Sequence, residues 1–144
     1  MKHNNSKYVL GHKITPVEVS GNYDLVLGET SSQVPGPPPH NHLKLDEVFI
    51  VIKGEMEFII NGKVKIAKAG DSIDLPRETI HTFRNASDST CTWINIHSPK
   101  GFMNFFNDMG IPIDQDDAMK KSIDKSIIDR VMLTAKNYDM HIKI

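Results

Sequence analysis

Residues 40–54 read His-Asn-His-Leu-Lys-Leu-Asp-Glu-Val-Phe-Ile-Val-Ile-Lys-Gly. The second half of this stretch is rich in β-branched and aromatic side chains, which favours a strand. Side chains two positions apart on a strand point to the same face, so His40 and His42 can offer two imidazole nitrogens to one point. Glu47 follows after a gap long enough for a turn and can bring a carboxylate oxygen there. This ligand set suits iron, manganese, nickel, zinc or copper rather than a thiolate zinc site.

A second stretch supplies a further histidine. Residues 70–85 read Gly-Asp-Ser-Ile-Asp-Leu-Pro-Arg-Glu-Thr-Ile-His-Thr-Phe-Arg-Asn. Gly70 and Pro76 predict turns before a short strand on which His81, Phe83 and Asn85 share one face. His81 therefore completes a candidate set of three imidazoles and one carboxylate.

Together the two stretches resemble the two motifs of the cupin family. The first motif, G-x5-H-x-H-x3,4-E-x6-G, is matched at His40, His42, Glu47 and Gly54. The second motif, G-x5-P-x-G-x2-H-x3-N, is matched at Gly70, Pro76, His81 and Asn85.

Two positions depart from the motifs, and both lie in expected turns. The opening glycine, expected at Val34, sits at Gly36, and the inner glycine of the second motif is Glu78. Neither is a ligand position. A glutamate where φ is positive costs about 1 kcal/mol, which a domain can absorb.

The resemblance implies an all-β fold, the cupin double-stranded β-helix or jelly roll, with short C-terminal helices packed outside the barrel. It implies one divalent transition metal per chain, either iron, manganese, nickel, copper or zinc. Dimers through an edge strand are common in the family, so we expect a homodimer. The tail is also similar to that of small single-domain cupins related to quercetin dioxygenases, whose closing Tyr-Gly is replaced here by Tyr138-Asp139.

Composition limits the classes of function. With 144 residues the chain has the length of one domain with a sizeable core. Its net charge of -1 comes without a basic stripe, so we expect no nucleic-acid partner. The single cysteine, Cys91, excludes an intramolecular disulfide and fits a reducing compartment. The sequence lacks a signal-peptide core and an apolar run of about 20 residues, so we expect a cytoplasmic protein without a membrane partner.

Short β-prone segments separated by turn signals indicate a barrel or sandwich. We expect N-terminal strands in residues 1–22, the barrel in residues 23–98 and a helical extension in residues 99–144. The proline-rich segment 31–39 should run as an extended loop. A hairpin over residues 55–66 is predicted to have a three-residue loop ending at Gly62. This register sets Phe58 opposite Val64 and pairs Glu57 with Lys65 across the strands.

The tail has a helical period. Apolar residues between Phe102 and Met109 predict a short helix that Gly110 ends. Met119, Ile123, Ile127, Val131 and Ala135 recur every four residues, which predicts a second helix within residues 115–138.

We expect a substrate pocket lined by the inward-facing side chains Phe49, Met56, Phe58, Phe83 and Trp93. Either Trp93 forms a pocket wall or it is only core, and the sequence leaves open which face of the strand at residues 90–97 points inward. For His97 we expect a plain strand or surface role, with a pocket or ligand role as the alternative. His3, His12 and His141 are expected in solvent. Cys91 is expected to be a small buried residue.

The leading hypothesis is a metal-dependent, dioxygenase-like oxidoreductase acting on a small, oxygen-rich organic compound. Glu47 would be its catalytic residue, changing from ligand to proton acceptor. One alternative is a metal-dependent isomerase of a sugar-like substrate, which would polarise a carbonyl with the same ion. The other alternative is a non-catalytic module that binds a metal and a small ligand.

Overall fold

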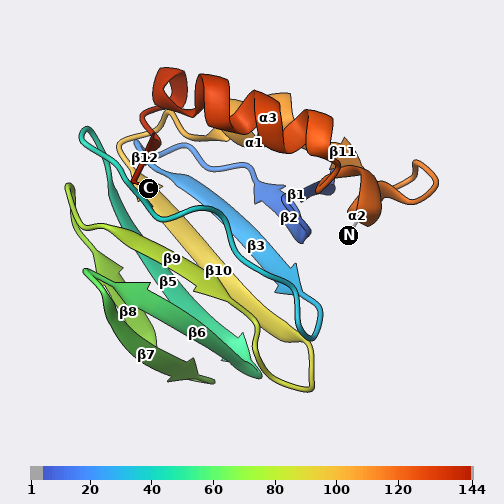
Figure 1. Ribbon diagram of the computed structural model, residues 1–144. Coiled ribbons are helices and arrows are strands. Elements are labelled where there is room, and N and C mark those ends of the chain that lie inside the picture. The colour runs from blue at the N-terminus through green and yellow to red at the C-terminus, as the bar shows by residue number, and fades with distance from the viewer. Residues whose placement is uncertain (1–4, 144) are drawn as a thin grey trace.

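The computed structural model describes residues 5–143. One sheet is built from β1 (Lys7–Val9), β2 (His12–Val17), β3 (Asp24–Thr30), β5 (Asp46–Lys53), β8 (Ser72–Leu75), β10 (Cys91–Ser98) and β11 (Ile111–Pro112). A second sheet is built from β4 (His40–Asn41), β6 (Glu55–Ile60), β7 (Lys63–Lys68), β9 (His81–Arg84) and β12 (His141–Ile142). The strand orders are β11-β1-β2-β3-β10-β5-β8 and β12-β4-β9-β6-β7. All described pairings are antiparallel, and the two sheets form the predicted jelly roll (Figure 1).

The hydrophobic core lies between the sheets. The Phe49 ring, on β5, lies 5.1 Å from the Phe58 ring and 5.2 Å from the Trp93 ring, centroid to centroid. On β10 every second residue is buried, which settles the face that the sequence left open: Cys91, Trp93, Asn95 and His97 point inward. Burial also raises the pKa of the Cys91 thiol to about 11, with a smaller effect from the charge of Glu55.

The loop before the first histidine begins with a turn at Ser32 and Gln33 and then runs extended, as predicted for the proline-rich part, directly on β9. A Cβ atom on Gly36 would sit 1.4 Å from the carbonyl oxygen of Phe83, so this position requires glycine. Val34 beside it accepts a hydrogen bond from the backbone of Asn85. Glu78, at the other departure from the motif, has a φ of 73°, as expected for a position that glycine usually takes.

The β6–β7 hairpin has a two-residue loop, so the predicted three-residue loop is wrong. Asn61 and Gly62 form it, with φ values of 49° and 82°, the positive values that a type I′ turn needs. Phe58 therefore lies opposite Lys65 rather than Val64.

The register was misjudged because β7 is an edge strand whose apolar residues do not face the core. Val64 and Ile66 are 62% and 43% exposed, so their alternation with lysines says nothing about the buried face. Glu57 lies opposite Ile66 and forms its ion pair with Arg84 of β9, not with Lys65.

The tail contains α1 (Met103–Met109), α2 (Ala118–Lys121), α3 (Lys125–Thr134) and the 3-10 helix η1 (Ala135–Tyr138). The short first helix is confirmed. The predicted second helix is interrupted, because Asp124 leaves the helical conformation and its side chain accepts a hydrogen bond from the backbone N–H of Ser126. Ser122 just before the break is buried and accepts a hydrogen bond from the backbone of Gly11. Figure 1 shows α1 and α3 lying across one end of the strands.

His12 is buried, so the expectation that it lies in solvent is wrong. It is 3% exposed, because β2 pairs with β3 and brings the ring against Phe83. Its Nδ1 lies 2.8 Å from the hydroxyl oxygen of Thr30, which also accepts a hydrogen bond from Trp93 Nε1. His141 is half-buried beside Asp139, and His3 lies outside the described residues.

Burial lowers the pKa of His12 to about 4, against an opposing effect of the Pro35 carbonyl, so acid should destabilise the fold through this residue. As the pH falls below about 6.5, the unfolded chain takes up a proton that the folded chain does not. The free energy of unfolding should therefore fall by up to about 3 kcal/mol by pH 4. Urea titrations of the parent and of His12→Gln between pH 7 and pH 4 measure this difference. Parallel losses in the two proteins would contradict it.

Candidate metal centre

The two sheets meet at a cluster of buried histidines around one carboxylate. In the smaller sheet His40 pairs with His81 across β4 and β9. In the larger sheet Glu47 pairs with His97 across β5 and β10. His42 lies in the connection from β4 to β5, which carries the chain from one sheet to the other. The cluster therefore forms only when both sheets are closed on each other.

Backbone carbonyls fix the orientation of the three predicted histidine ligands. Nδ1 donates to the carbonyl of Pro38 in His40 (2.8 Å), of Asp139 in His42 (2.7 Å) and of Thr79 in His81 (3.0 Å). A carbonyl oxygen only accepts, so each Nδ1 carries its hydrogen, and each ring in its neutral form has its free lone pair on Nε2. One nitrogen of each ring lies within 4.8 Å of the others, a spacing that fits a shared metal ion.

Glu47 completes this arrangement from the opposite sheet. Its Oε1 lies 3.0 Å from His81 Nε2 and 3.4 Å from His42 Nε2. Among residues 5–143 this buried oxygen has no partner with good hydrogen-bond geometry. A buried anionic oxygen is costly unless positive charge lies beside it. A proton on His81 Nε2 supplies that charge in the metal-free protein, and a metal ion would supply it in place of the proton. The donor set therefore fits a divalent metal ion. His40, His42 and His81 form one close group, and Glu47 Oε1 reaches two of its members, His42 and His81.

The second oxygen of Glu47 is held by two residues of β10. Oε2 accepts a hydrogen bond from Asn95 Nδ2 at 2.9 Å and lies 3.0 Å from His97 Nε2. His97 is 1% exposed, so the expected strand or surface role is wrong. It also forms a second group of nearby metal-type ligands with His42 and Glu47. The sequence shows that His97 shares a strand face with Trp93 and Asn95. It does not show that this face points inward, and without that fact the burial of His97 could not be predicted.

The charges in the cluster depend on one another. Burial by itself would raise the pKa of Glu47, but His97 and His81 beside it hold that pKa well below its ordinary value. Burial would likewise lower the pKa of His81, but the Glu47 carboxylate raises it. Burial, assisted by His81 and His42, lowers the pKa of His40 to about 3. A charged Glu47 is suited to metal binding and is a weak base, so its proton-accepting role stays a prediction.

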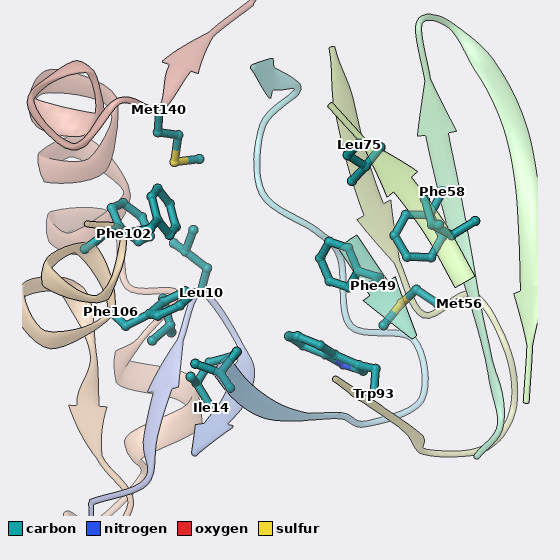
Figure 2. Packing of buried hydrophobic residues seen from close by; sticks show 14 of the residues in the cluster. Leu10, Ile14, Phe49, Met56, Phe58, Leu75, Trp93, Phe102, Phe106 and Met140 are labelled. Atoms are coloured by element: carbon teal, nitrogen blue, oxygen red, sulfur yellow. The ribbon is translucent and has the colours of Figure 1, made fainter. Parts of the chain in front are cut away.

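A cavity of about 50 Å³ opens beside the cluster. Of the predicted pocket residues, Phe49, Phe83 and Trp93 line it, while Met56 and Phe58 are not among its lining residues. Figure 2 shows Met56 and Phe58 on the far side of Phe49 from Leu10 and Phe102, where they fill the space between the sheets.

Segments on both sides of the barrel also line the cavity, and these lining residues were not predicted from the sequence. The added side chains are mainly apolar and include Leu10, Ile14, Phe102, Phe105, Phe106 and Met140. The expectation that the aromatic stripe of α1 packs outside the barrel is wrong. Instead it closes the cavity, with the Phe102 ring 4.9 Å from the His42 ring.

Comparison with known sequences gives a partial match. Residues 30–97 match the family model described as a cupin domain. The oxidoreductase OpS7 of Beauveria bassiana is 40% identical over 57 residues, which are 39% of this chain. The match spans only 19% of the length of that relative.

Solved structures share the fold. A cupin 2 conserved barrel domain protein from Salinispora arenicola has a TM-score of 0.60 and 15% identity, covering 92% of both chains. A sugar phosphate isomerase from a cupin superfamily of Silicibacter pomeroyi has a TM-score of 0.58 and 18% identity, covering 63% of this chain and 61% of that one. At these identities the likeness shows the fold alone. In residues 5–143 no helix has the length and apolar character to cross a membrane.

Replacing His42 by alanine should remove the metal and leave the fold. The variant loses one of three Nε2 donors, whereas the packing of Phe49 against Phe58 and Trp93 stays in place. We expect bound metal to fall from about one ion per chain to near zero by elemental analysis, with an unchanged circular dichroism spectrum. His12→Gln is the matched control, because His12 is a buried histidine on the same cavity outside the ligand set. A His42→Ala protein with parental metal content would refute the ligand assignment.

Metal affinity should fall as the pH falls. The raised pKa of His81 means that, in the metal-free protein, this ring holds a proton at pH values where free histidine has lost it. A metal ion must displace that proton, so below the pKa of His81 the affinity should drop at least about tenfold per pH unit. Calorimetric titrations in buffers of different ionisation enthalpy measure the released proton. Release of no proton at mildly acidic pH would contradict this coupling.

Proposed function

We propose, from the premise that this chain belongs to the cupin superfamily, that it is a metal-dependent, dioxygenase-like oxidoreductase acting on a small, oxygen-rich organic compound. One observation carries the proposal: three imidazole nitrogens and a single carboxylate oxygen lie together in a buried cluster beside a cavity lined mainly by apolar and aromatic side chains. Such a cluster suits a reaction on a small molecule from which water must be excluded.

Four protein ligands leave coordination positions open on an ion that commonly takes six, so a bound ion would supply Lewis acidity and a template for oxygen ligands. The rest of the chemistry belongs to the chain. Asn95 and His97 hold Oε2 of Glu47 and so keep Oε1 directed at the histidines. Phe49, Phe83 and Trp93 form an apolar wall that orders a planar substrate and limits the access of water.

The identity to the oxidoreductase OpS7 supports this reaction class, although it covers a small part of that protein. Iron, copper, manganese or nickel fits oxygen chemistry better than zinc. The small-molecule substrate and a homodimer are further parts of the proposal.

Dioxygen uptake tests the function. Protein loaded separately with Fe²⁺, Mn²⁺, Ni²⁺ or Cu²⁺ is mixed with acetylacetone as a small enolisable probe or with quercetin as a polyhydroxylated ring, and consumption is followed with an oxygen electrode. We expect consumption with at least one metal and probe, and its loss in His42→Ala.

Absence of uptake with every pair would contradict the dioxygenase proposal for these probe classes. Interconversion of an aldose phosphate and a ketose phosphate would then favour the isomerase. Binding of a probe without turnover, seen as quenching of the single tryptophan, Trp93, would favour a binding module.

A further inference from the structure

We propose that residues 139–143, here called the C-terminal strap, belong to the metal centre, and that Asp139 is a positioning residue that sets the tautomer and orientation of His42. This inference rests on the proposed metal site but adds a residue outside the segment that matches the cupin domain, 30–97. The barrel alone lacks the hydrogen-bond acceptor that one of its own candidate ligands uses.

Asp139 holds His42 from two directions. Its backbone carbonyl accepts the hydrogen on His42 Nδ1 at 2.7 Å. Its carboxylate accepts hydrogen bonds from the backbone N–H groups of Leu43, at 3.0 Å, and Lys44, at 2.8 Å. One residue of the tail therefore fixes both the ring of His42 and the chain that immediately follows it. The remaining contact of this carboxylate is with His141 Nε2, at 3.0 Å.

The backbone of the C-terminal strap explains how the carbonyl reaches the ring. Asp139 has φ 60° and ψ 32°, a left-handed conformation that ends η1 and reverses the chain. The following strand, β12, pairs with β4, so that Ile142 lies opposite His40. Lys143 then donates a backbone hydrogen bond to Pro39. The C-terminal strap therefore runs directly beside the segment that carries both histidines.

The hydrogen on Nδ1 matters for the metal because His42 is buried. Without the carbonyl, Nδ1–H would be an unsatisfied buried donor, and the proton would be free to move to Nε2. A ring with its proton on Nε2 has no lone pair for the shared site. Partners that orient metal-bound histidines typically change metal affinity 10- to 100-fold.

The test compares two aspartates of the same conformation. Asp139→Ala removes the three carboxylate contacts, with Leu43, Lys44 and His141, and places alanine at a positive φ. The backbone carbonyl is kept, but the carboxylate no longer anchors it to the chain that follows His42. Asp117→Ala imposes the same backbone strain at φ 54°, but the Asp117 side chain makes no capping hydrogen bond. We measure Zn²⁺ affinity by competition with a chromophoric chelator. We expect affinity to fall 10- to 100-fold in Asp139→Ala and to stay within twofold of the parent in Asp117→Ala.

A metal-free readout separates positioning from general stability. In ¹⁵N NMR spectra of the imidazoles, parental His42 should show the Nδ1–H form alone, and Asp139→Ala should populate the Nε2–H form. Asp139→Gly, which accepts positive φ without strain, removes the carboxylate if the alanine variant does not fold.

The outcomes distinguish this inference from the proposed function. Unchanged Zn²⁺ affinity together with an unchanged His42 tautomer would overturn the role of Asp139. Equal losses of Zn²⁺ affinity in Asp139→Ala and Asp117→Ala would also overturn it, because backbone strain that destabilises the fold would then explain both losses. A parent that binds no Zn²⁺ would overturn the metal site, while the tautomer shift would still decide whether Asp139 positions His42.

Discussion

The structure depends on the burial of one charged carboxylate between two sheets. Glu47 lies at the junction of the sheets, where an uncompensated charge would cost several kcal/mol. Each oxygen of Glu47 has polar neighbours that offset this cost. Oε2 contacts Asn95 and His97 of the same sheet. Oε1 faces His81 of the other sheet and His42 of the connection. Closure of the two sheets on each other therefore also assembles the candidate metal centre.

The segments outside residues 30–97 contribute side chains and a backbone acceptor to the candidate site. The N-terminal strands and α1 close the cavity with apolar side chains, and the tail supplies a carbonyl to His42. The shared barrel thus provides the ligands, while the flanking segments decide the size and polarity of the space beside them. This division fits the general rule that one fold can serve different reactions when its site differs.

Several local features could be predicted because they depend on near neighbours in sequence. The helix before Gly110 follows from the helical period of its apolar residues. The positive φ of Glu78 follows from the motif that Glu78 interrupts, where glycine is usual. The failures have a common cause. The predictions for the β6–β7 hairpin and the tail helix both assume that every regularly spaced apolar residue faces the core. Val64 instead lies exposed on an edge strand, and Ile123 lies between two helices.

The sequence by itself determined the barrel fold and the four candidate ligands, because both follow from the spacing of residues within two short motifs, at residues 40–54 and 70–85. Only the tertiary structure decided the surroundings of these ligands. The burial of His12 and His97, the contact of His97 with Glu47 and the acceptor at Asp139 arise from residues that are 50 or more positions apart or from strand order. Such contacts leave no periodic signal, since each depends on which strands become neighbours when the two sheets close.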